Sequence, residues 1–157
     1  MENKEEYQKI FEEAKKYYRG LSKVTSPALG QEVHFNAKGF NHILYRKKQY
    51  KRSHKEQIRR FRLLSLAMKL IGFTNTYQEY EDTSKETGLL HANDSLNQSK
   101  NTQFWGLIAI TEGRKIKVIL RKVGSDGNVH FWSIIPSWKT NKRDDKLFDM
   151  KGNPFED

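Results

Sequence analysis

The chain has 157 residues, of which 36% are hydrophobic and 12% aromatic, and this is enough for one folded domain with a modest core. It has no cysteine and no run of about 18 apolar residues. These absences exclude disulfides, thiolate zinc sites, thiol catalysis and a membrane-spanning helix, and they favour the cytoplasm. The formal net charge of +10 favours a polyanionic partner, most often a nucleic acid.

Residues 1–20 are predicted to form an N-terminal helix. Their apolar side chains recur at spacings of three and four between Tyr7 and Tyr18, which is typical of an amphipathic helix. Residues 22–31 contain proline and glycine and are predicted to be a loop. Residues 33–35 could form a short strand.

A second helix is predicted to begin at Asn36, because asparagine is a good N-cap residue. Phe35 and Phe40 flank this position at the spacing of a hydrophobic staple. His42 and Arg46 are four residues apart, so they are expected to stack on the polar face of this helix.

The most basic part of the chain follows. Residues 38–72 contain eleven lysines and arginines and one acid, Glu56. The capping-box pattern from Ser53 to Glu56 opens a third helix, which is predicted to run to about Ile71. Such concentrated charge favours a nucleic-acid site, although a solvated helix face gives the same pattern. The candidate contacts here are Lys47, Lys48, Lys51, Arg52 and Arg59.

The C-terminal half is predicted to be a sheet. Residues 82–103 are polar and are expected to form a long loop. Three apolar runs, 104–111, 115–123 and 129–136, are separated by turn residues and predict an antiparallel three-stranded meander. Residues 139–157 are expected to be a flexible tail. Helices followed by an antiparallel sheet of about four strands predict one α+β domain.

The last hairpin brings together side chains of several kinds. If Val123 pairs with Val129, one sheet face carries two cations, an aromatic ring and a hydroxyl: Lys117, Arg121, Phe131 and Ser133. The opposite, apolar face receives Trp132, and His130 lies near the turn. The first face fits an RNA-binding surface, and the alternative is an exposed edge of charged residues. A β-bulge in the hairpin would exchange the two faces.

His42 and Arg46 are the candidate pair for phosphodiester chemistry. An imidazole titrates near neutrality and can move protons, and a guanidinium can hold a phosphate. Alone, however, this spacing is a weak signal, because most such pairs are ordinary surface residues. Acids are scarce in the basic segment and no histidine pair has a carboxylate at metal-ligand spacing, so neither a metal nor a cofactor is predicted.

Two segments resemble a known group of enzymes. Residues 35–46, FNAKGFNHILYR, and residues 115–136, KIKVILRKVGSDGNVHFWSIIP, resemble a helix and a late hairpin of phage-associated nucleases of the barnase–EndoU–colicin–RelE group. The resemblance covers about residues 31–137. It implies helices packed on an antiparallel sheet and RNA cleavage without a metal. It also implies an active-site set of His42, Arg46, Arg121 and Ser133, with Lys117 as a further candidate. The insert at 82–103 and the strongly basic third helix depart from the group.

The expected function is therefore a metal-independent endoribonuclease. In it, the RNA 2′-hydroxyl attacks the phosphorus, His42 moves the proton, Arg46 and Arg121 neutralise charge, and Ser133 positions a phosphate oxygen. Such an enzyme would be a toxin or a phage or mobile-element effector. Its partners would be RNA, with tRNA one candidate, and an inhibitor or immunity protein.

Two alternatives stay open. One is a non-catalytic RNA- or DNA-binding domain, and the other is a basic ribosome-associated or structural protein. Residues that hold phosphate serve catalysis and binding alike, so the sequence does not separate them. The position of His42 in the structure can separate the two. Catalysis needs the His42 ring to face Ser133 across a cleft, whereas a His42 sealed in the core favours binding.

Overall fold

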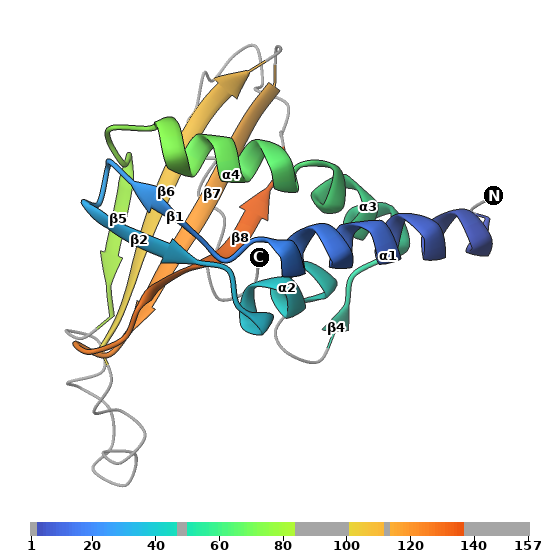
Figure 1. The fold of residues 1–157 in the computed structure, drawn as a ribbon, viewed down its shortest axis with the longest axis horizontal. Coiled ribbons are helices and arrows are strands. Elements are labelled where there is room, and N and C mark those ends of the chain that lie inside the picture. Colours follow the sequence, from blue (N-terminus) through green and yellow to red (C-terminus); the bar gives the residue numbers. More distant parts are fainter. Residues whose placement is uncertain (1–2, 47–49, 84–100, 112–113, 137–157) are drawn as a thin grey trace, which may run out of the picture.

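The computed structural model describes residues 3–46, 50–83, 101–111 and 114–136. These residues form an α+β fold, which confirms the predicted class (Figure 1). The helices are α1 (Lys4–Gly20), α2 (Ala37–Leu44), α3 (His54–Arg62) and α4 (Leu64–Phe73). The strands are β1 (Lys23–Ser26), β2 (Gln31–His34), β3 (Tyr45–Arg46), β4 (Tyr50–Lys51), β5 (Glu79–Asp82), β6 (Thr102–Thr111), β7 (Arg114–Val123) and β8 (Val129–Ile135).

The main sheet has six strands in the order β1-β2-β8-β7-β6-β5, more than the four or so expected. The meander β6–β7–β8 lies where the three apolar runs predict it. The predicted loop at 22–31 is wrong in part, because it contains β1 and the first residue of β2. β2 pairs in parallel with β8, with Val33 opposite Val129, and so attaches the N-terminal hairpin to the meander.

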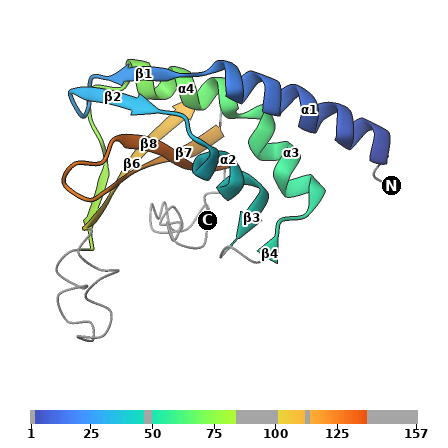
Figure 2. The ribbon, with the colours of Figure 1, turned by 60° about the horizontal axis from the view of Figure 1, so that its bottom comes forward.

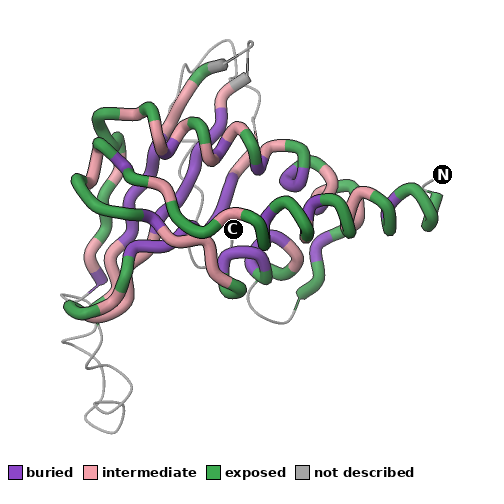
Figure 3. Tube along the Cα trace, viewed as in Figure 1, coloured by how far each residue is buried: buried purple, intermediate pink, exposed green. Residues whose placement is uncertain are grey.

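Helix α4 lies along one side of the sheet, and α1 extends beyond the strands next to α3 (Figure 2). The apolar core lies between the helices and the sheet and follows the central strands in Figure 3. Its completely buried side chains include Ile71 from α4, Leu107 from β6, Val118 from β7 and Ile134 from β8. Tyr18 of α1 is also buried, so the predicted N-terminal helix and its apolar face are both confirmed.

The predicted third helix is two helices in the structure. Its start is confirmed: the Ser53 hydroxyl accepts a hydrogen bond from the Glu56 N–H, and Glu56 accepts one from the Ser53 N–H. The helix is interrupted at Leu63, where ψ is −3°, and a second helix, α4, follows and ends at Phe73. This break lets α3 pack against α1 while α4 packs against β1 and the sheet.

Two expectations fall mostly on residues that the structure does not describe. The expected loop at 82–103 includes residues 84–100, and the expected tail is residues 139–157. Among the helices of the described ranges, none is long and apolar enough to cross a membrane.

Candidate nucleic-acid interface

The site begins with the close approach of α2 to β8. Asn36 caps α2 as predicted, with its side-chain oxygen accepting from the Gly39 N–H at 3.1 Å. A Cβ atom at Gly39 would overlap the carbonyl oxygen of Phe131, so glycine permits this contact. His42 lies one turn further on the same helix face. Its ring stacks on Trp132 of β8, with centroids 4.3 Å apart and planes 23° apart.

The expected exposure of His42 is therefore wrong. The residue is 7% exposed, because α2 is packed on two sides. Gly39 and His42 face β8, while Phe40 contacts aromatic rings of α1 and α3. The helix also ends at Leu44, so Arg46 lies in β3 rather than one helical turn beyond His42.

A β-bulge changes which side chains share a face in the last hairpin. Lys117 pairs with Ile135 and Ile119 with Ser133, as expected. A register shift between Ile119 and Leu120 then places Arg121 opposite His130 instead of Phe131. The expected binding role of Phe131 is wrong, because its side chain is completely buried in the core.

The same bulge brings Trp132 to Arg121. The guanidinium carbon of Arg121 lies 3.6 Å from the centre of the indole ring, which is a cation–π contact. The Arg121 Nε donates a hydrogen bond to His130 Nε2 at 3.0 Å. Trp132 thus contacts both Arg121 and His42. The structure therefore brings the candidate residues His42 and Arg121 together through the Trp132 ring. The expected hairpin register had placed Trp132 on the opposite face of the sheet.

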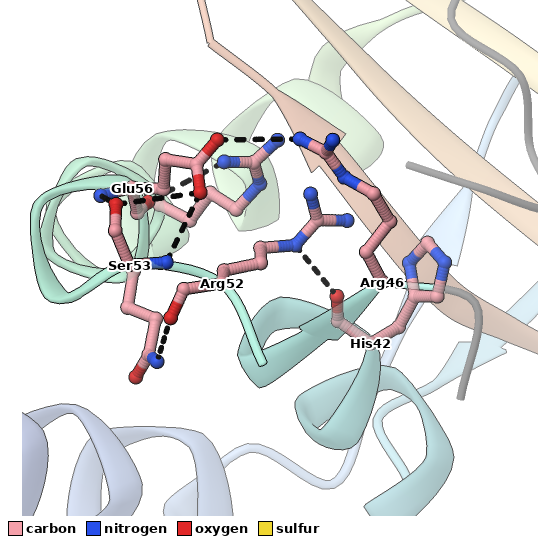
Figure 4. A network of polar contacts seen from close by, with 7 residues as sticks. His42, Arg46, Arg52, Ser53 and Glu56 are labelled. Carbon is pink, nitrogen blue, oxygen red and sulfur yellow. Dashed lines mark hydrogen bonds and ion pairs between the residues drawn. The ribbon is translucent and has the colours of Figure 1, made fainter. Parts of the chain in front are cut away.

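Two further arginines approach His42 from the other side. The Arg52 Nε donates to the His42 carbonyl oxygen at 3.3 Å, and the Gln57 side-chain amide donates to the Arg52 carbonyl oxygen at 2.7 Å (Figure 4). Arg60 Nη1 donates to the Glu56 carbonyl oxygen at 3.4 Å. Both arginine side chains are buried. We call Arg52, Arg60 and Arg121, gathered around His42, the arginine cluster.

Burial, together with the charges of the arginine cluster, lowers the pKa of His42. Burial is the largest cause that lowers its pKa, followed by the charges of Arg52, Arg121 and Arg60, and the pKa falls to about 3. The nearby Trp132 backbone opposes this only in part. Both imidazole nitrogens are buried without a hydrogen-bond partner. Burial and the charge of Arg121 likewise lower the pKa of His130, to about 4. At pH 7 both rings are uncharged.

Among the residues that the structure describes, the elements that carry the cluster supply little negative charge. The six elements that build the site (α2, β3, β4, α3, β7 and β8) carry one carboxylate between them, Glu56. Arg46 Nη2 lies 3.3 Å from Glu56 Oε1, so Arg46 sits at the margin of the cluster (Figure 4). Partial burial raises the Glu56 pKa, but the Ser53 N–H and the charges of Arg46 and Arg60 outweigh it and lower the pKa overall.

The remaining candidates divide into three groups. Lys51 and Arg59 are exposed, as a phosphate contact requires. Lys47 and Lys48 lie outside the described residues. Lys117 and Ser133 are buried, and the Lys117 ammonium lies 2.7 Å from Glu79 Oε2. The expected phosphate contact by Lys117 is wrong, because its charge is already paired inside the protein.

One residue of the cluster could have been found from the sequence. Gln57, Arg60, Phe61 and Leu64 follow the i, i+3, i+4, i+7 spacing, and all four are buried. A charged residue within an apolar helix stripe signals a special environment. Trp132 and His130 gave no such signal, because only the bulge places them beside Arg121.

Comparisons with known proteins give no relative: no family model, curated protein or solved structure matches this chain. In the described part of the chain, there is no group of three or more histidine or acidic side chains that could hold a metal ion. The expected independence from metal stays a prediction.

Proposed function

We propose that this protein binds the phosphate backbone of RNA, and that the arginine cluster is its main phosphate contact. The observation that carries this proposal is the gathering of three arginines around a neutral histidine, in elements that supply one carboxylate. A phosphate group is attracted to such a concentration of positive charge and accepts the two-pronged hydrogen bonds that arginine offers.

Access from solvent supports the same proposal. Arg46 is exposed, and Arg121 and Trp132 are partly exposed, so they form the outer side of the site. An incoming phosphate would meet these residues before the buried Arg52 and Arg60. RNA is the nucleic acid we propose because of the resemblance to the barnase–EndoU–colicin–RelE group. A cytoplasmic location is part of the proposal and rests on the absence of cysteine.

RNA cleavage without a metal is the second candidate. The observation that favours it is the position of the His42 imidazole beside Arg121 and Arg52, since a group that moves protons and the cations that hold a phosphate must lie together. His42 would take the proton of the 2′-hydroxyl as that oxygen attacks the phosphorus, and the arginines would stabilise the negative phosphorane. The 5′-oxygen would leave with a proton returned by the imidazole, giving a 2′,3′-cyclic phosphate and a 5′-hydroxyl.

We place binding before cleavage because of the burial of His42. Cleavage requires the imidazole, 7% exposed, to become accessible when RNA binds, whereas the partly exposed Arg121 can contact a phosphate without such a change, and Arg52 and Arg60, which are as buried as His42, add their charge from behind it. The role of a toxin or phage effector, with an inhibitor protein as partner, belongs to the cleavage candidate alone.

One experiment separates these outcomes. End-labelled RNA is incubated with the protein in EDTA, and both binding and end groups are analysed. Intact, bound RNA supports the first candidate. Fragments that end in a cyclic phosphate support the second, and an RNA with 2′-deoxyribose at the cleaved position should then stay intact. RNA that is neither bound nor cut contradicts the proposal.

A further inference from the structure

The β3–β4 hairpin joins α2, which carries His42, to α3, which carries Arg60. Tyr45 pairs with Lys51, and Arg46 pairs with Tyr50. The Arg52 N–H donates to the Leu44 carbonyl oxygen at 2.8 Å and closes the base of the hairpin. The hairpin is thus held beside the arginine cluster by the backbone of one of its members.

The two tyrosines of this hairpin lie on different faces. Directly opposed residues of an antiparallel pair share a face, so Tyr50 lies with Arg46 and Tyr45 lies with Lys51. Arg46 reaches Glu56, whose carbonyl oxygen accepts from Arg60. The face that carries Tyr50 is therefore the face directed at the cluster.

Tyr50 is 64% exposed, although a tyrosine ring is large and mostly apolar. None of the aromatic contacts found in the described residues involves it. An exposed ring beside arginines is the combination that proteins use for single-stranded nucleic acids, in which cations hold the backbone and bases stack on the ring. In a duplex, the paired and stacked bases are not available to such a ring.

We infer that Tyr50 stacks on a base next to the phosphate held by the arginine cluster, and that the substrate is single-stranded RNA. This inference rests on the proposed function and adds a substrate class to it. The exposed tyrosine supplies base stacking, and Arg46, opposite it in the hairpin, contacts Glu56 at the margin of the cluster.

The test compares three variants by fluorescence anisotropy: Tyr50→Ala, Tyr50→Phe and the matched control Tyr45→Ala, which changes the same residue type on the other face. The probes are a labelled single-stranded oligouridine, the same length of RNA duplex, and inorganic polyphosphate, which has charge but no bases. Circular dichroism checks that each variant is folded.

Tyr50→Ala should weaken binding of the single strand about 5- to 100-fold, which is the usual effect of removing one stacking aromatic ring. Tyr50→Phe and Tyr45→Ala should stay within about twofold of the wild type, and polyphosphate binding should be unchanged in all three. The wild type should prefer the single strand to the duplex.

Two results would overturn the inference while leaving the proposed function in place. One is a Tyr50→Ala variant that binds the single strand as tightly as the wild type does. The other is a wild type that binds the duplex at least as tightly as the single strand. A wild type that binds neither RNA nor polyphosphate would contradict the proposed function itself, and with it the inference.

Discussion

The protein buries cationic side chains in two regions, and the two are built differently. On β7, the completely buried Lys117 faces Glu79 of β5 at 2.7 Å. Gly106 makes room for this pair, since a Cβ there would lie 3.0 Å from Glu79 Oε2 and 3.4 Å from Lys117 Cδ. In the arginine cluster, by contrast, three arginines and a neutral histidine lie in elements that supply one carboxylate.

The difference indicates what each region does. A buried ion pair that is complete within the fold needs no ligand, and its role is structural. The arginine cluster concentrates positive charge, and an anion that bound it only in the folded protein would stabilise the fold by mass action. We therefore propose a structural role for Lys117 and a phosphate-binding role for the arginine cluster.

The largest expected effect is a loss of folding stability at acidic pH. His42 and His130 have pKa values of about 3 and 4 in the folded protein, below the ordinary value near 6.5. The unfolded chain therefore binds protons below pH 6.5 that the folded protein does not, and stability falls as the pH falls from about 6.5 toward 4. We expect the free energy of unfolding to drop by about 4 kcal/mol between about pH 6 and pH 4, at about 1.4 kcal/mol per pH unit for each histidine.

Urea unfolding at several pH values measures this drop. His42→Gln removes one of the two titrating groups and should reduce it by about half. The same pH dependence in His42→Gln and in the wild type would show that the folded protein does not hold His42 neutral.

The next largest effect concerns the buried ion pair between Lys117 and Glu79. Glu79→Gln leaves the Lys117 charge buried with a neutral partner and should cost about 2 kcal/mol, toward the low end for buried pairs because Glu79 is partly exposed. Lys117→Met removes the buried charge and leaves a carboxylate that water can reach, so its cost should be within about 1 kcal/mol. Thermal unfolding measures both. If either variant changed RNA affinity, the structural assignment of Lys117 would be wrong.

The smallest effect concerns the exposed cations of the basic segment. Replacing Lys47, Lys48 and Arg59 together by glutamine should weaken RNA binding about threefold to tenfold and reduce the slope of log affinity against log salt by about 2. Affinity measured across a salt series tests this. An unchanged slope would mean that these side chains form only a solvated surface.

The sequence predicts the parts of the fold that depend on residues close together in the chain. The Asn36 cap, the Ser53–Glu56 capping box and the three apolar runs of the meander each depend on neighbouring residues, and all are confirmed. The parallel pairing of β2 with β8 joins segments far apart in the chain, and no local pattern specifies it.

The candidate site was predicted less well because it depends on packing. The β-bulge turns Phe131 into the core, where it stacks on Phe35 with centroids 5.8 Å apart and meets Tyr18 at 6.1 Å. Burying this ring moves Trp132 to the face of Arg121. His42 is buried for a related reason, since Gly39 allows α2 to approach β8 closely. Residue types therefore indicated which side chains to consider for a site, but tertiary contacts decided which of them meet.

The most direct test of the central claim compares the RNA affinity of two variants that lose the same charge. Arg121→Gln removes a member of the arginine cluster, whereas Lys16→Gln removes an exposed cation from α1. We expect Arg121→Gln to weaken RNA binding about 10- to 100-fold, because it removes charge-assisted hydrogen bonds to phosphate. Lys16→Gln should stay within about twofold of the wild type. Equal losses in the two variants would mean that RNA responds only to net charge, and would contradict the assignment of the arginine cluster as the binding site.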